Sequence, residues 1–207
     1  MKLFKLTDKE GYTRRGQEGE TKWEEGFTLR LNPCENPRLC TSDVIHFYTN
    51  PNLAFLLNPA HANIENPQLW EIEGDPVVEN WDKGGTFSLT TVKKLPKPEW
   101  TKRKTRLVQI AFAKLCSTAA NEAAACATAN ADANAVDAAH VAACNATYAA
   151  NRVAACNADM TRDTYTTCAI YYAANAAMYT DYHINFAELA DTAVKMVMGV
   201  CGLQSCL

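Results

Sequence analysis

The pattern of apolar and polar positions changes character near residue 98. Before this point, short apolar or alternating runs are bounded by Asn, Pro, Gly and Asp, which predicts strands with two distinct faces. A short helix is predicted over 52–57, because Pro51 precedes it and the pair Asn58-Pro59 is expected to end it. The predicted strands are 2–6, 44–48, 69–72 and 86–95.

The second half of the chain lacks the residues that usually interrupt helices. Residues 99–198 contain neither glycine nor proline, and alanine occupies 20 of the 40 positions from 119 to 158. Alanine has the best helix propensity, so helices are predicted throughout 99–198, with Gly199 as the final C-cap. Breaks are expected where Ser, Thr and Asp side chains can cap, near 117–118, 159–164 and 180–183.

A seven-residue spacing aligns small side chains along one side of the alanine-rich segment, as in a coiled coil. Each buried methyl group contributes only about 0.8 kcal/mol, so stability requires helices that approach one another closely, within the chain, between chains or both. The residues expected to pack along this line, called the alanine seam below, are Val136, Ala139, Ala143, Ala146, Ala150, Val153 and Met160.

These patterns together predict an α+β protein in two parts. Residues 1–98 form a small α+β module, and residues 99–207 form an alanine-rich, close-packed helical region that mediates self-association. One rival interpretation of the helical region is ice binding, because segments such as 117–125 resemble the Thr-Ala-Ala-Asn repeats of helical antifreeze proteins. The threonines do not keep the eleven-residue spacing of those repeats.

Charge and hydropathy argue against two kinds of partner, nucleic acids and membranes. Residues 1–115 carry 17 Lys and Arg against 15 Asp and Glu, whereas residues 116–207 carry only 3 against 8. Because nucleic-acid binding needs clustered cations, the acidic second half argues against it. No apolar run is long enough for a membrane span.

The cysteine pattern favours a reducing compartment. The nine cysteines are odd in number, they form no CxxC pair, and no leader-like segment opens the sequence. We therefore expect a cytoplasmic protein with free cysteines and no metal site.

The densest cluster of polar and aromatic residues lies in 39–75. Its strand places His46 and Tyr48 on one face and Ile45 and Phe47 on the other. Such side chains could stack and hydrogen-bond a base or a sugar, although they could equally be half-buried core residues beside Asn-Pro turns. The candidate ligand-binding residues are His46, Tyr48, Asn58, His61, Trp70 and Glu71.

Catalytic motifs are absent from the sequence. We find no nucleophile with a base at a recognisable spacing, no glycine-rich phosphate loop and no HExxH, so neither catalytic residues nor a cofactor are predicted. An ADP-ribosyltransferase-like enzyme remains an alternative, because His46, Tyr48 and a later glutamate would supply its His-Tyr-Glu set.

The first 116 residues resemble an uncharacterised family of bacteriophage and prophage proteins with an N-terminal module and an alanine-rich tail. The sequence departs from the family pattern at Asp43, where a glycine is expected, and in lacking a Trp-rich segment after the first helix. The matching residues are Leu39-Cys40, His46, Tyr48, Pro51, Leu53-Ala54, Leu56-Leu57-Asn58-Pro59, His61-Ala62, Pro67, Leu69-Trp70-Glu71, Thr90-Thr91-Val92 and the helix start Arg106 to Cys116.

The resemblance implies a phage setting and a site of action in the host cytoplasm. The leading hypothesis is a non-enzymatic phage accessory protein that self-associates through its helices and sequesters a host ligand, such as a signalling nucleotide, as an anti-defence protein would. A host protein is an alternative partner. A structural protein that forms oligomers or filaments is the second hypothesis.

Overall fold

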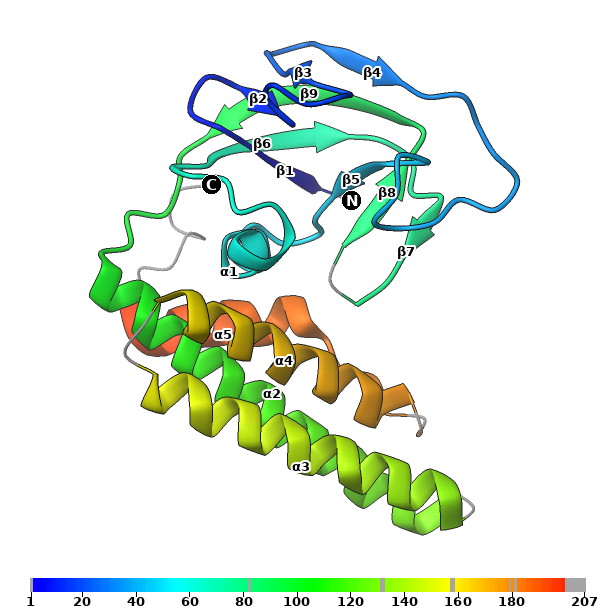
Figure 1. Ribbon diagram of the computed structural model, residues 1–207, viewed down its shortest axis with the longest axis vertical. Helices are drawn as coiled ribbons and strands as arrows, with labels where there is room; N and C mark the ends of the chain where they lie inside the picture. The colour runs from blue at the N-terminus through cyan, green and yellow to red at the C-terminus, as the bar shows by residue number, and fades with distance from the viewer. Residues whose placement is uncertain are drawn as a thin grey trace. The chain divides into compact units, whose positions relative to one another are not determined.

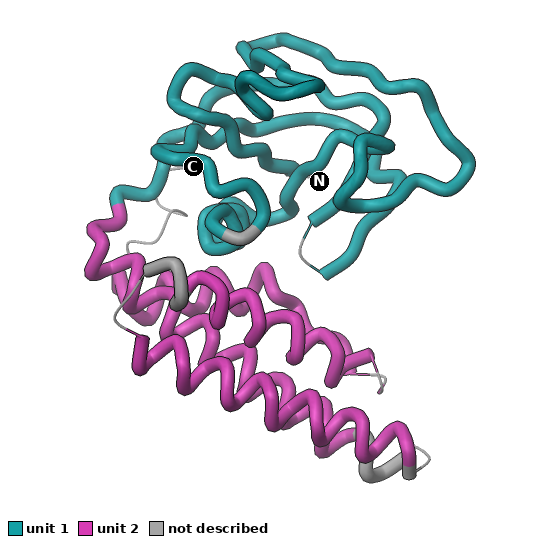
Figure 2. The backbone as a smooth tube through the Cα atoms, in the orientation of Figure 1, with its two compact units in different colours: residues 1–99 teal, residues 100–207 magenta. Residues whose placement is uncertain are grey.

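The computed structural model divides the chain into two compact units, residues 1–99 and 100–207 (Figure 2). The structure describes residues 2–81, 83–130, 133–156, 159–178, 180 and 182–199, and the side chains of 60, 127–130, 133 and 159–162 lie outside this description. A small N-terminal sheet region followed by a packed helical region confirms the predicted α+β class.

The first unit is built from short antiparallel strands arranged in three sheets (Figure 1). The four-stranded sheet has the order β1-β6-β9-β4, a hairpin pairs β2 with β3, and the three-stranded sheet has the order β5-β8-β7. Strands β2, β3, β4 and β7 were not predicted. The strand predicted over 86–95 begins at Ser88 as β9, and Thr86 belongs instead to the separate strand β8, which was not predicted. The strands are β1 (Leu3–Thr7), β2 (Tyr12–Thr13), β3 (Thr21–Lys22), β4 (Thr28–Arg30), β5 (Ile45–Phe47), β6 (Gln68–Glu73), β7 (Val78–Glu79), β8 (Gly84–Thr86) and β9 (Ser88–Leu95).

An antiparallel bridge between Phe4 and Tyr48 joins the four-stranded sheet to the three-stranded sheet. The backbone N–H of Phe4 donates to the Tyr48 carbonyl, and the N–H of Tyr48 donates to the Phe4 carbonyl, both at 2.8 Å. This pair of bonds fixes the end of β5 against β1, and thereby sets His46 and Tyr48 beside the side chains of β1.

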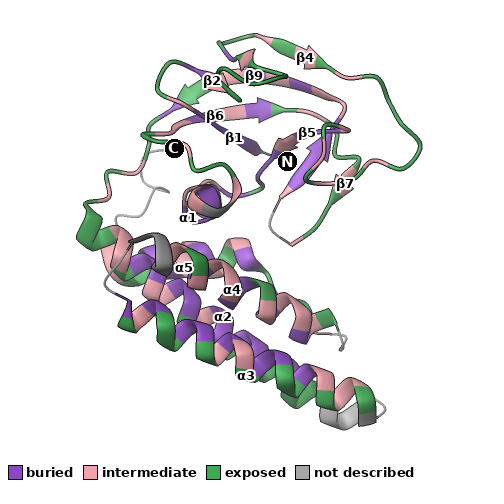
Figure 3. Ribbon diagram, viewed as in Figure 1, coloured by how far each residue is buried: buried purple, intermediate pink, exposed green. Residues whose placement is uncertain are grey.

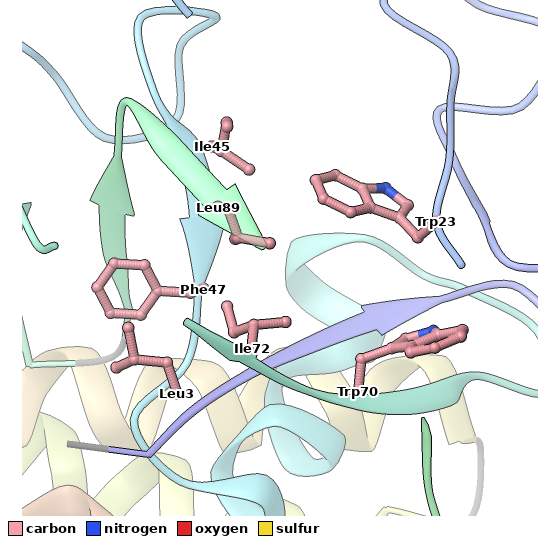
Figure 4. Packing of buried hydrophobic residues seen from close by; sticks show 7 residues of the cluster. All are labelled: Leu3, Trp23, Ile45, Phe47, Trp70, Ile72 and Leu89. Carbon is pink, nitrogen blue, oxygen red and sulfur yellow. The ribbon is translucent and has the colours of Figure 1, made fainter. Parts of the chain in front are cut away.

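Seven buried apolar side chains form one cluster in the core of the first unit (Figure 4). They are Leu3, Trp23, Ile45, Phe47, Trp70, Ile72 and Leu89. Close packing explains the glycine pair in β8, because a Cβ atom at Gly84 would lie 2.2 Å from Cζ of Phe47. The strand therefore carries glycine where the phenyl ring needs the space.

The helix α1 (Pro51–His61) is one turn longer than predicted. Asn50 caps its start, since the side-chain oxygen accepts the N–H of Leu53 at 2.9 Å and Pro51 occupies the first turn. The expected stop at Asn58-Pro59 is wrong, because the Asn58 carbonyl accepts the N–H groups of Ala62 and Asn63 and the helix continues through Pro59. This extra turn carries His61.

The described part of the second unit contains four helices, α2 (Lys102–Asn130), α3 (Ala133–Ala155), α4 (Asp159–Met178) and α5 (Phe186–Met198). Helix α2 contacts α3, α4 and α5, and α3 also packs against α4. The predicted C-cap is confirmed, because Gly199 has a φ of 74° and its N–H donates to the Lys195 carbonyl at 3.0 Å. No helix in the described ranges has both the length and the apolar character of a membrane span.

The expected break near 117–118 is wrong, because α2 runs through it without interruption. The hydroxyl groups of Ser117 and Thr118 form hydrogen bonds that do not interrupt the helix. The Ser117 hydroxyl lies 2.9 Å from the Thr147 hydroxyl on α3, and the Thr118 hydroxyl donates to the Lys114 carbonyl at 3.2 Å within the same helix. Helix α2 instead ends at Asn130 and α3 begins at Ala133, a position where no break was expected from the sequence.

Most of the alanine seam is buried in the second unit, and Figure 3 shows the buried positions along α3. Its central members Ala139 and Ala146 have no exposed surface, and Val136 at its start is half-buried. The seam is therefore used to pack helices of one chain, so a second copy of the protein would have to contact other residues. Ala143, Ala150 and Val153 are also buried, whereas the side chain of Met160 lies outside the described residues.

A candidate ligand-binding cavity

A cavity of about 1120 Å³ opens in the first unit. Its walls come from β1, the β2–β3 hairpin, β5 with the loop before it, and the end of α1 with the loop after it. The volume slightly exceeds the usual range for pockets that hold a cofactor or a drug-sized molecule, roughly 300–1,000 Å³. The cavity is thus large enough for a nucleotide-sized ligand.

Three of the six predicted site residues line this cavity, namely His46, Tyr48 and His61. They come from β5, from the residue that follows it and from the last turn of α1. Side chains alternate between the two faces of β5, so His46 and Tyr48 lie on the same face, and the bridge from Phe4 to Tyr48 holds this strand against β1. The extra turn of α1 adds His61 to the same wall.

The other three predicted residues do not line the cavity, because each has a structural role. The Asn58 side chain exchanges two hydrogen bonds with the backbone of Ile64, at 2.9 and 3.1 Å, and so fixes the loop after α1. Trp70 belongs to the core, where its indole N–H donates to the Thr7 hydroxyl at 3.0 Å. Glu71 lies 3.5 Å from Lys93 in a cross-strand ion pair.

His46 is neutral at physiological pH. Its Nε2 accepts the backbone N–H of Cys40 at 2.9 Å, so the ring proton lies on Nδ1. Burial, the largest cause, and the neighbouring groups Lys83, Lys5, Arg14 and His61 together lower the pKa of His46 from 6.5 to about 4. A ring with a low pKa and an occupied Nε2 is a poor general base near neutral pH.

Tyr48 and His61 form a pair in the cavity wall. Their rings are nearly parallel, with an interplanar angle of 11° and centroids 6.0 Å apart. The Tyr48 hydroxyl and Nδ1 of His61 are 3.2 Å apart, so each holds the other in place. The pair presents an aromatic surface that is fixed before any ligand arrives, which reduces the entropy lost on binding.

The structure reveals a residue that the sequence analysis missed, Lys5. It lies in the middle of β1 and lines the cavity, yet its exposed fraction is only 8%. Burial, with a smaller effect of the Arg14 charge, lowers the pKa of Lys5 from 10.5 to about 7. The signal that could have revealed it is a lone cation inside an otherwise apolar strand, Leu-Phe-Lys-Leu-Thr.

Backbone strain is concentrated at the same cavity. Four described residues other than glycine have a positive φ, and three of them line it: Arg14 at 54°, Cys40 at 64° and Asn66 at 50°. This conformation costs of order 1–2 kcal/mol for a residue with a side chain, somewhat less for Asn. Such residues are enriched at binding and catalytic sites, where the surrounding structure holds them.

The described residues contain no group of three or more His, Cys, Asp and Glu side chains arranged to hold a metal ion. The seven cysteines among them are all free. No family model, no curated protein and no solved structure matches this chain.

Proposed function

We propose that the first unit binds a small anionic ligand of the nucleotide class, and that the protein holds this ligand without transforming it. The observation that carries the proposal is the cavity, where aromatic side chains such as Tyr12 and Tyr48 and cationic side chains such as Lys5 and Arg14 line one space. Aromatic faces stack on bases, and cations attract phosphates.

The state of His46 supports binding over catalysis. Its Nε2 is engaged by Cys40, and its pKa of about 4 keeps the ring from accepting a proton at neutral pH. The resemblance to phage proteins extends the same proposal to a role. The protein would be a phage accessory protein that sequesters a host signalling nucleotide in the host cytoplasm.

Calorimetry with the full-length protein tests this proposal. Mononucleotides, linear dinucleotides and cyclic dinucleotides would be titrated in turn, and native mass spectrometry of the freshly purified protein would detect a retained molecule. We expect at least one of these ligands to bind at micromolar concentration. Loss of that binding in Tyr48→Ala, with Tyr171→Ala on the helical unit as the matched control, would place the ligand in the cavity. No binding in the whole series refutes the proposal.

An ADP-ribosyltransferase-like activity is the second candidate. One observation favours it, because His46, Tyr48 and Glu65 line the same cavity. This enzyme would release nicotinamide from NAD⁺, which chromatography detects directly. Turnover that disappears in His46→Ala would establish the activity, whereas no release by the intact protein would exclude it.

Self-association through the helical unit is a third, structural candidate. The observation in its favour is a set of large apolar side chains that remain exposed on α3 and α4: Val141 at 61%, Tyr148 at 60% and Tyr171 at 53%. Exposed apolar groups of this size often mark contact surfaces. Sedimentation velocity of the full-length protein over a range of concentrations tests it, and a monomer throughout would exclude it. The ice-binding alternative has no comparable support, since the Thr147 hydroxyl is engaged with Ser117.

A further inference from the structure

Lys5 places a cationic group at the margin of the apolar core of the first unit. It shares a face of β1 with Leu3, and its cross-strand neighbour on β6 is Trp70, so both flanking positions belong to the core. The ammonium group lies 4.6 Å from the centre of the Trp23 ring. Lysine is almost never buried to this extent without a partner of opposite charge.

The Lys5 ammonium group has one hydrogen-bond acceptor among the described residues, the carbonyl oxygen of His46 at 3.0 Å. A lysine ammonium carries three N–H donors. No described carboxylate forms an ion pair with it. Two donors of a buried cation are therefore left for a group that enters the cavity.

Three of the four carboxylates of the cavity wall, those of Asp8, Glu10 and Glu20, contact groups other than Lys5. Arg15 pairs with Glu10 at 2.7 Å and with Asp8 at 3.5 Å, and Lys9 pairs with Glu10 at 3.4 Å. The remaining carboxylates of the wall are Glu20, which accepts the backbone N–H of Gly16, and the exposed Glu65.

The cations of the wall are in surplus near Lys5. Arg14 and Lys83 line the cavity, and within the described chain neither forms an ion pair. Their charges act on the same region, because Arg14 lowers the pKa of Lys5 and both lower the pKa of His46. The Arg14, Lys83 and Lys5 charges that act on these two groups are positive, so the cavity has a positive potential at this end.

We propose that Lys5, together with Arg14 and Lys83, forms a subsite for the phosphoryl group of the cavity's ligand. The inference rests on the proposed function, because it names the charged part of the same ligand. A phosphoryl group offers several oxygen acceptors and up to two negative charges, which match the two spare donors of Lys5 and the three cations. The cavity is far larger than this group alone, so the ligand also has an organic part.

A phosphoryl anion would supply the opposite charge that the buried ammonium group of Lys5 lacks. An unpaired buried cation costs free energy, and an anion nearby favours its protonated form. Binding should therefore draw a proton onto Lys5 whenever the pH lies above the pKa of the free protein's Lys5. Calorimetry in two buffers of different ionisation enthalpy counts that proton.

The experiment uses inorganic pyrophosphate as the probe, so that it does not depend on the organic part. Phosphorus NMR of pyrophosphate with the full-length protein at pH 8, at constant ionic strength, is expected to show line broadening that saturates. Lys5→Met should weaken the binding at least tenfold, and Arg14→Gln and Lys83→Gln should weaken it less. Lys97→Met, which removes an exposed lysine outside the cavity, should leave it unchanged.

The outcomes separate this inference from the proposed function. No broadening with the wild-type protein, or equal broadening with Lys5→Met, overturns the subsite. Nucleotide binding that survives unchanged in Lys5→Met overturns the subsite and leaves the proposed function standing. Pyrophosphate binding that needs Lys5, in a protein that binds no nucleotide, supports the subsite and removes the nucleotide. Circular dichroism shows whether Lys5→Met is folded. If it is not, loss of pyrophosphate binding in Arg14→Gln, at an exposed residue, and in Lys83→Gln, at a half-buried residue, still tests the subsite.

Discussion

Replacing Lys5 by methionine should stabilise the first unit, and the gain should depend on pH. Methionine fills a similar volume without a charge, so it removes the desolvation cost of the ammonium group. The pKa of Lys5 falls from 10.5 to about 7 on folding, which at 1.36 kcal/mol per unit corresponds to a cost of about 4–5 kcal/mol at and below neutral pH. The bond to the His46 carbonyl, worth about 1 kcal/mol, and the contact with the Trp23 ring offset part of this gain.

The sign of the pH dependence follows from proton binding. Between about pH 7 and 10.5 the unfolded chain still holds the Lys5 proton, whereas the folded protein has released it. The unfolded state therefore binds more protons in this window, so wild-type stability rises with pH. From pH 7 to pH 9 the wild type should gain about 2 kcal/mol relative to Lys5→Met.

Urea unfolding followed by tryptophan fluorescence measures this difference. Three of the four tryptophans, Trp23, Trp70 and Trp81, belong to the first unit, so the signal reports mainly on it. Circular dichroism at the helical wavelength follows the second unit as an internal control. Other titrating groups cancel when the two proteins are compared at each pH. Parallel stability profiles for the two proteins would show that Lys5 keeps its ordinary pKa and would refute the burial argument.

Three further predictions concern other parts of the molecule. Because the pKa of His46 falls from 6.5 to about 4, the unfolded chain takes up its proton first on acidification, so stability is lost as pH falls through that window. His46→Gln should flatten this acid limb in the same urea assay, and an unchanged limb would contradict the assignment. Gly84→Ala should destabilise the first unit by about 1–3 kcal/mol, because the new methyl group meets the Phe47 ring, and a melting temperature equal to that of the wild type would argue against this packing. If the helical unit self-associates through α3, Tyr148→Ser should weaken association in sedimentation velocity while Leu107→Ser, exposed on α2, should not; equal effects would exclude a contact on α3.

Secondary structure was predictable where the residues of one segment determine it without a distant partner. Strand β1, strand β6 and the glycine-free helical region follow from alternation, β-branched residues and alanine content. The errors arise where a partner distant in sequence decides. Ser117 and Thr147 are 30 residues apart, and their contact turns an expected cap into a helix interior.

The candidate site was predictable only in part for the same reason. His46 and Tyr48 follow from alternation along one strand, and both reach the cavity. Trp70 could not be separated from them by residue type, because only the fold places its indole in the core beside Thr7. For Lys5 the sequence offers only a weak signal, a lone cation in an apolar strand, because its burial depends on Trp23 and on the backbone of β5, which lie 18 and more residues away.

The alanine seam has a consequence for how this protein can change over generations. A single nucleotide change in an alanine codon yields Gly, Pro, Ser, Thr, Val, Asp or Glu. Glycine and proline weaken a helix, and most of the other residues are larger than alanine or charged. At positions such as Ala139 and Ala146, which have no exposed surface, almost every single-nucleotide substitution should therefore reduce stability. Sequence drift should therefore be slow along the inner faces of α3 and faster on its outer face, around Val141 and Tyr148.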